Sequence, residues 1–286
     1  MIKRKILLTL IVFTSLVACF FLLKNTLMEK EEYTYKIITH GMGKIDGMIS
    51  SNTKEGFEVS YENGNRLFDA DIRFSRDNEL ILCHEWNALL GYFSYQEKDI
   101  YYDDLHVGQL PNELLPDKDE FSEIRIKGEY TPLCFSDVIG YMKEKTDFYI
   151  FLDIKTDIKK TLEKICLDCK NDPKLLDRMI PSVYHFEDVD IAKEIYPFKN
   201  IAIRQYENKE ISPEEIVDFC KKRKVNIVNI NYKYCTESLL SFYQDNNMSV
   251  FVAVINNEEE LDNFLSMGAS GIVSDDIFED MVNGKR

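Results

Sequence analysis

The chain has 286 residues, of which 45% are hydrophobic and 30% charged, a composition that excludes intrinsic disorder. Its formal net charge of −15 repels nucleic acids and anionic lipid surfaces, so we expect no nucleic-acid partner. An anionic substrate would therefore need a metal ion or a few well-placed cations.

The amino-terminal segment predicts a membrane anchor. Basic residues at 3–5 precede an apolar run from Ile6 to Leu23, about the length that spans a bilayer, which takes ~17–25 residues. The basic flank predicts a cytoplasmic amino terminus. We therefore expect residues 1–30 to form a single-pass signal anchor in the cell membrane, with residues 31–286 as an extracytoplasmic domain.

A lipoprotein signal is the alternative for this segment. Residues 16–19, Leu-Val-Ala-Cys, resemble a lipobox that ends at Cys19. The apolar run continues past this cysteine through residues 20–23, where a mature lipoprotein usually turns polar, and this favours the anchor.

From Tyr35 onward, short β-rich apolar runs alternate with amphipathic helical patterns. This βα alternation over about 250 residues predicts one (β/α)8 TIM barrel. The expected strands are 35–39, 67–74, 148–155, 179–185, 200–206, 226–231, 249–256 and 271–275.

Capping patterns predict where several helices begin. We expect Asn52 to cap a helix that ends near Gly64, and Ser212 with Pro213 to start another. Acidic residues after Asn257 predict a third helix, which would stop at Gly268.

Two features interrupt the alternation. Residues 79–84 predict an extra short strand, and residues 86–131 form a long aromatic insertion before a helix near 135–145. Loops of this length often shape or cover a site. The seven cysteines include a Cys166-x-x-Cys169 pair within a helical pattern, without a second pair at zinc spacing, and we expect buried thiols rather than disulfides.

Acidic side chains fall on two strands with the spacing that puts them inside a barrel. Asp69 and Asp71 share one face of a strand, and Asp153 and Lys155 share one face of the next. Inward carboxylates repel unless a cation lies between them, and three of them suit Mg²⁺ or Ca²⁺. Lys155 would add the positive charge that a phosphate needs.

Two histidines end strands near this acidic face. His40 follows the first strand, and His84 follows the extra strand. Two imidazoles near one metal supply the proton acceptor and the proton donor that phosphodiester cleavage requires. His106, in the insertion, and His185, a candidate rim residue, are weaker candidates.

The order of these motifs resembles the glycerophosphodiester phosphodiesterase family, which runs His-Arg-Gly, Glu-Asn-Thr, Glu-x-Asp, His-Asp, Glu-x-Lys and Gly-Ile-x-Thr-Asp. The resemblance spans about residues 36–280. The matching segments are Ile38–Gly41, Ser51–Phe57, Phe68–Asp71, Leu82–Glu85, Thr131–Leu133, Asp153–Lys155 and Gly271–Asp275.

The resemblance implies a metal-dependent hydrolase that cleaves glycerophosphodiesters or related lipid or polymer headgroups. Carried over by position, the Mg²⁺ or Ca²⁺ ligands would be Asp69, Asp71 and Asp153. His40 and His84 would form the acid–base pair, with the assignment of acid and base left open, and Lys155 would contact phosphate. No protein partner is inferred.

Departures from the family pattern concern the substrate more than the chemistry. Gly41 stands where the family has a phosphate-binding arginine, and the first acids of two motifs are shortened to aspartate. Without that arginine, phosphate binding would rest on the metal and Lys155, helped by Lys44 or Arg73. The alternative is that position 41 needs glycine for its backbone angles. An inactive surface module that binds glycerophosphate-type ligands and a phospholipase C-like enzyme are the alternative functions.

Overall fold

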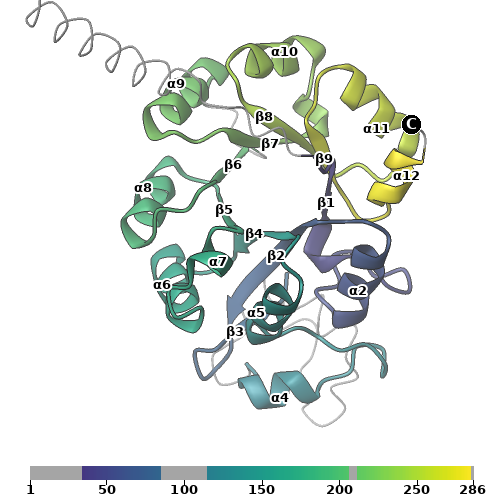
Figure 1. Ribbon diagram of the computed structural model, residues 1–286, viewed down its shortest axis with the longest axis vertical. Coiled ribbons are helices and arrows are strands. Elements are labelled where there is room, and N and C mark those ends of the chain that lie inside the picture. Colours follow the sequence, from purple (N-terminus) through teal and green to yellow (C-terminus); the bar gives the residue numbers. More distant parts are fainter. Residues whose placement is uncertain (1–33, 85–114, 206–210, 285–286) are drawn as a thin grey trace, which may run out of the picture. The chain divides into compact units, whose positions relative to one another are not determined.

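Parallel strands close into a barrel in the computed structural model, which describes residues 34–84, 115–205 and 211–284 (Figure 1). The sheet order is β1-β9-β8-β7-β6-β5-β4-β2, and pairing of β1 with β2 closes the ring. The strands of the ring are β1 (Ile37–Thr39), β2 (Leu67–Phe74), β4 (Tyr149–Ile154), β5 (Met179–Val183), β6 (Ala202–Gln205), β7 (Ile227–Asn231), β8 (Ser249–Ala253) and β9 (Gly271–Ser274). The predicted (β/α)8 barrel is confirmed.

The extra strand predicted at 79–84 is confirmed as β3 (Leu80–Leu82), which pairs antiparallel with the end of β2. Helices lie outside the ring of strands in Figure 1. They are α2 (Lys54–Glu62), α4 (Lys118–Glu123), α5 (Phe135–Glu144), α6 (Ile158–Asp168), α7 (Pro173–Leu176), α8 (Phe186–Ile195), α9 (Pro213–Arg223), α10 (Glu237–Asp245), α11 (Glu258–Ser266) and α12 (Glu279–Asn283), with 3₁₀ turns η1 (His40–Met42) and η4 (Tyr232–Tyr234).

Alternation along each strand separates two apolar layers. On β2, Phe68, Ala70 and Ile72 join the large cluster between the sheet and the helices. Leu67 belongs instead to the cluster inside the barrel, with Phe151. Because successive side chains point to opposite faces, the next inward positions after these apolar residues are polar, and they form the site.

Two of the three predicted helix starts are confirmed. Ser212 accepts a hydrogen bond from the Glu215 main-chain nitrogen in a capping box, and Asn257 caps α11. The prediction for Asn52 is wrong, because Thr53 caps α2. Asn52 takes a left-handed φ of 50° that directs its side chain to an acid of the site.

Several predictions concern residues outside the described ranges. The anchor of residues 1–30 and most of the insertion, residues 86–114, fall there, while α4 occupies part of residues 115–131. Within the described ranges, no helix combines the length and the apolar character needed to cross a membrane. The cysteines in these ranges are free thiols, and burial raises the pKa of Cys169 to about 12, as expected for a structural role.

Candidate active site

Charged side chains gather at the carboxyl ends of β2, β4 and β6, where they point into the barrel above its apolar interior. Asp71 stands beside Asp153 in the register of β2 and β4. Asp69, Asp71 and Asp153 are each at most 2% exposed. The strand spacing thus brings together the three acids that the sequence singled out.

Asp71 is held as a carboxylate by neutral and cationic partners. Its Oδ2 accepts hydrogen bonds from Asn52 Nδ2 at 2.8 Å and Ser50 Oγ at 3.0 Å. Lys155 Nζ lies 3.1 Å from Oδ1 as an ion pair. Burial raises the pKa of Asp71, but Lys155 and the hydrogen bond from Asn52 outweigh it and bring the pKa to about 2.

Asp69 and Asp153 share the guanidinium of Arg204, which projects from β6. Arg204 Nη2 lies 2.6 Å from Asp69 Oδ1, and Nη1 lies 2.8 Å from Asp153 Oδ2. Lys155 Nζ donates to the same Asp153 oxygen at 2.7 Å. Burial raises the pKa of Asp69 despite this guanidinium. Burial lowers the pKa of Lys155, but the charges of Asp71 and Asp153 outweigh it and raise that pKa.

Tyr184, directly after β5, borders the same cluster. Its hydroxyl lies 3.2 Å from Asp153 Oδ1, and its ring centre lies 5.8 Å from the guanidinium carbon of Arg204. The side chain is 39% exposed, so it stands between the buried charges and solvent.

His40 and Asp275 form a dyad at the ends of β1 and β9. His40 Nδ1 lies 2.9 Å from Asp275 Oδ1. Burial lowers the pKa of His40, but the hydrogen bond and charge of Asp275 outweigh it, so the pKa is raised. Burial raises the pKa of Asp275, but the hydrogen bond and charge of His40 outweigh it, so that pKa is lowered. Each member therefore stabilises the charged form of the other.

Asn256 fixes the carboxylate of the dyad. Its Nδ2 donates to Asp275 Oδ2 at 2.9 Å. Its Oδ1 accepts from the Asp275 main-chain nitrogen at 2.8 Å and from Ser274 Oγ at 3.1 Å. Both ends of the amide are engaged, so Asp275 can present only Oδ1 to His40.

His84 faces the dyad from the end of β3. The ring centres of His40 and His84 lie 6.4 Å apart, with an interplanar angle of 83°. Arg73 supports His84 from β2, because its Nη2 donates to the His84 main-chain oxygen at 2.7 Å and its Nε donates to the Cys83 oxygen at 3.1 Å. The structure brings together the two histidines that the sequence paired.

Gly41 is required by its backbone conformation. Its φ is 49°, and a Cβ at this position would lie 1.9 Å from Ser50 Oγ and 2.5 Å from Ser50 Cα. Left-handed φ and this close approach both demand glycine. The backbone angles of Gly41 therefore support the conformational need for glycine, and an arginine side chain does not fit here.

The two auxiliary phosphate cations suggested by the sequence are engaged elsewhere. Lys44 pairs with Asp276, and Arg73 donates to main-chain oxygens. His185 is exposed at the start of α8, and His106 lies outside the described residues.

Sequence reasoning missed Arg204 and Tyr184 and gave Asp275 no role. Each follows an inward-facing apolar or small residue by two positions: Arg204 follows Ala202, Tyr184 follows Ser182, and Asp275 follows Val273. Strict alternation along the expected strands would have placed all three in the barrel mouth.

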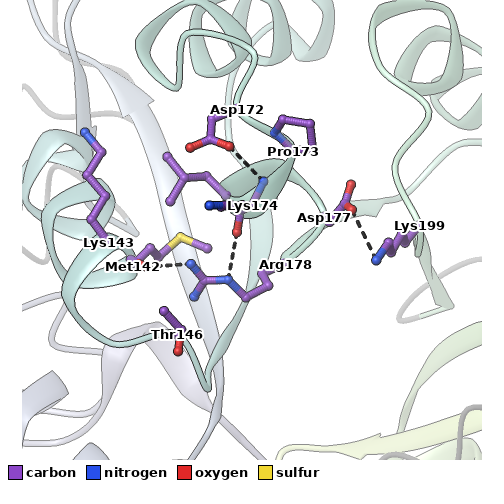
Figure 2. Close-up of a pocket in the computed structure, with 10 residues that line it drawn as sticks. Met142, Lys143, Thr146, Asp172, Pro173, Lys174, Asp177, Arg178 and Lys199 are labelled. Atoms are coloured by element: carbon purple, nitrogen blue, oxygen red, sulfur yellow. Dashed lines mark hydrogen bonds and ion pairs between the residues drawn. The ribbon is translucent and has the colours of Figure 1, made fainter.

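The cavity drawn in Figure 2 is a different feature. It measures about 550 Å³ and lies before β4 and β5, at the amino-terminal ends of these strands. Arg178 is used there to bind main-chain oxygens, including that of Lys174 at 3.0 Å, and Lys199 pairs with Asp177. None of the residues that line the cavity belongs to the site, which lies at the other ends of the strands.

The comparison with protein families agrees with these motifs. The model of the glycerophosphoryl diester phosphodiesterase family matches residues 43–279, and the chain belongs to this family. No curated protein matches the chain.

Several solved structures with the same fold are named as phosphodiesterases. One, named as a glycerophosphodiester phosphodiesterase from Galdieria sulphuraria, has a TM-score of 0.68 and 18% identity over 87% of this chain and 97% of its own. A Thermotoga maritima glycerophosphodiester phosphodiesterase gives 0.62 and 18%, over 89% and 99%. An Oleispira antarctica phosphodiesterase in complex with the product sn-glycerol-3-phosphate gives 0.64 and 14%, over 87% and 94%. These structures share the fold of the chain, and the family match identifies it as a phosphoric diester hydrolase of the glycerophosphodiester phosphodiesterase type.

Proposed function

We propose that the chain hydrolyses glycerophosphodiesters, or related lipid or polymer headgroups, with His40 and His84 as its acid–base pair. The observation that carries the proposal is the pairing of two imidazoles, 6.4 Å apart, one of them bound to a buried carboxylate. A phosphodiester that lies between the rings would have a proton acceptor on one side and a donor on the other.

His40 is the base in this proposal. Asp275 accepts the Nδ1 proton, which leaves Nε2 as the nitrogen that takes a proton from the nucleophile, either water or a neighbouring substrate hydroxyl. The nucleophile attacks phosphorus and the bond from phosphorus to the leaving oxygen breaks. Protonated His84 gives that oxygen a proton, so the product leaves as a neutral alcohol.

The predicted cation site does not fit a metal as its side chains are arranged. Three aspartates suit Mg²⁺ or Ca²⁺, and members of the family commonly use a divalent metal. Here Asp69 and Asp153 bind Arg204, and Asp153 and Asp71 bind Lys155. Asp69 Oδ2 is the one oxygen of the three acids with neither a hydrogen bond nor an ion pair among the described residues. In the same ranges, no group of three or more His, Cys, Asp or Glu side chains is arranged to hold a metal ion.

A membrane location remains part of the proposal and rests on the sequence alone. The basic flank and the apolar run of residues 6–23 support a signal anchor that places the enzyme outside the cytoplasm. Protease added to intact cells should then cleave the domain, while alkaline carbonate should leave it in the membrane pellet. Release by carbonate, or protection from protease, would argue against the anchor.

Turnover of glycerophosphocholine, a lysophospholipid and a glycerophosphate polymer by the full chain tests the reaction. His40→Ala and His84→Ala should each lower kcat by at least ~10², the lower end of what general acid–base catalysis contributes. His185→Ala, at the exposed start of α8, is the matched control and should leave turnover unchanged.

The product and the ligand affinity separate the alternatives. Phosphorus NMR tells a linear from a cyclic phosphate product, and a cyclic one would indicate attack by a substrate hydroxyl, as in a phospholipase C-like enzyme. Binding of a glycerophosphate-type ligand without turnover of any substrate would point to an inactive surface module and refute the proposed hydrolysis.

A further inference from the structure

Arg204 takes the position that a bound cation would need. It projects from β6 and bridges an acid on β2 to an acid on β4, with contacts of 2.6 Å to Asp69 and 2.8 Å to Asp153. The Arg204 side chain is 6% exposed. One side chain therefore does what a metal does in a three-carboxylate site, since it joins acids that would otherwise repel each other.

Lys155 is the second cation of this cluster. Its Nζ reaches Asp153 at 2.7 Å and Asp71 at 3.1 Å, so each of the three acids contacts at least one cationic side chain. A divalent ion ligated by all three acids would have to displace Arg204 from two of them. It would also bring two positive charges against the guanidinium, which stays protonated at any working pH.

We propose that Arg204, with Lys155, replaces the divalent metal in this chain, so that the two side chains supply the positive charge for the phosphate. The inference rests on the proposed function. In a buried site a fixed cation stabilises the charge that develops on the phosphate oxygens without any rearrangement. Tyr184 keeps the guanidinium in place from the solvent side through its ring and through Asp153.

The first experiment measures metal binding without reference to turnover. The full chain is treated with chelator, and Mn²⁺ binding is followed by electron paramagnetic resonance. We expect no stoichiometric Mn²⁺ on the wild type and one Mn²⁺ per chain on Arg204→Gln, where the acids have lost a cation. One tightly bound Mn²⁺ on the wild type that Asp71→Asn abolishes would overturn the proposal.

The second experiment measures turnover of glycerophosphocholine in excess chelator and with Mg²⁺ or Ca²⁺. Wild-type kcat/KM should be the same in all three, and Arg204→Gln should lower it by ~10²–10³, the usual effect of removing one preorganised electrostatic donor. Added Mn²⁺ should restore part of the activity of Arg204→Gln. Loss of wild-type activity in chelator, with recovery on adding metal, would again overturn the proposal.

Two controls separate folding from function. Arg223 pairs with Asp190 through two nitrogens on the outer helices, so Arg223→Gln removes an equivalent charge pair away from the site and should leave both readouts unchanged. If Arg204→Gln does not fold, Asp69→Asn with Arg204→Gln removes both charges and should fold and remain poorly active in chelator. Full activity of that double variant would count against Arg204.

Failure of the inference is distinguishable from failure of the proposed function. If no substrate is hydrolysed under any condition, the proposed hydrolysis is wrong, and the Mn²⁺ measurement still decides whether Arg204 holds the cation position. If hydrolysis requires metal, the proposed hydrolysis stands and the replacement of metal by Arg204 is wrong.

Discussion

Asp275→Asn should move the ring proton of His40 from Nδ1 to Nε2 while hardly changing the shape of the site. Asn256 Nδ2 donates to Asp275 Oδ2, and Asn256 Oδ1 is already occupied as an acceptor. The new amide must therefore turn its oxygen to Asn256 and its NH₂ to His40. His40 Nδ1 then has to accept, so the ring proton moves to Nε2, and the nitrogen that should act as the base is blocked.

The expected loss follows from the loss of the base. General acid–base catalysis contributes about 10²–10⁴ in rate, which corresponds to a barrier increase of roughly 3–5 kcal/mol. Asp275→Ala cannot impose the wrong tautomer, because it offers no donor. We therefore expect Asn to be at least as damaging as Ala, the reverse of what a purely structural role would give, since Asn preserves the shape and the bond to Asn256.

The assay is kcat/KM against pH for the wild type, Asp275→Asn and Asp275→Ala. Because Asp275 raises the pKa of His40, the wild-type rate should rise with pH through a point above the ordinary histidine value of about 6.5. Without the carboxylate, the acidic limb of the residual activity should move to lower pH. The assignment of His40 as the base that Asp275 orients would be refuted if Asp275→Asn were more active than Asp275→Ala. It would also be refuted if the acidic limb of the pH profile stayed at the wild-type pH in the variants.

Three further predictions follow from the same contacts. Lys155→Gln should lower kcat/KM by roughly 10–100-fold, the equivalent of about 1.5–3 kcal/mol for a hydrogen bond to a charged group, and an unchanged value would exclude a phosphate role. Arg73→Gln should release the His84 main chain and lower kcat by roughly ten-fold, or ~1.4 kcal/mol, with KM unchanged, with partial recovery in Arg73→Lys; a rise in KM alone would contradict this. The His40–Asp275 pair should add stability that is fully present between about pH 4 and 6.5, because the raised pKa of His40 loses it as pH rises and the lowered pKa of Asp275 loses it as pH falls. Urea unfolding measured below, within and above this pH window should show that dependence in the wild type and not in Asp275→Asn.

Local patterns were sufficient for the barrel and for two groups of site residues. Asp69 and Asp71 lie two apart on one strand, so their common face follows from the geometry of that strand alone. His40 follows the barrel strand β1, whose carboxyl end lies at the active-site face. His84 follows β3, which runs antiparallel to the end of β2 and so returns the chain towards that face. Both inferences need only the strand positions, which the sequence marks with apolar runs.

The partners of these residues depend on distances across the barrel that a single sequence does not encode locally. Arg204 lies 135 residues from Asp69 in the chain, and β6 and β2 are not neighbours in the sheet. The sequence therefore predicted that the acids need a cation and suggested a metal, but it did not reveal that a guanidinium on a distant strand contacts two of them. The same limit applies to Asp275, whose role depends on the closure of β9 against β1.

Gly41 offers a test in which space and backbone conformation can be separated. A Cβ at position 41 would meet both a left-handed φ, which costs about 1–2 kcal/mol, and Ser50 at 1.9 Å, where overpacking costs about 1–3 kcal/mol more. Gly47 is the matched control, because its φ is 77° but nothing lies within 4 Å of its Cβ position. Gly47→Ala should pay only the conformational cost, and the excess loss of unfolding free energy in Gly41→Ala should measure the clash.

The clash should also reach the chemistry, because Ser50 donates to Asp71 at 3.0 Å. We therefore expect Gly41→Ala to lower kcat/KM and Gly47→Ala to leave it unchanged, with urea unfolding and turnover measured on the same preparations. Gly41→Arg adds a longer side chain to the same strained position, so it should be less stable than Gly41→Ala. A Gly41→Arg variant that folds with wild-type stability and binds glycerophosphodiesters more tightly would show that the loop accepts the family's arginine, and the conformational explanation for glycine would be wrong.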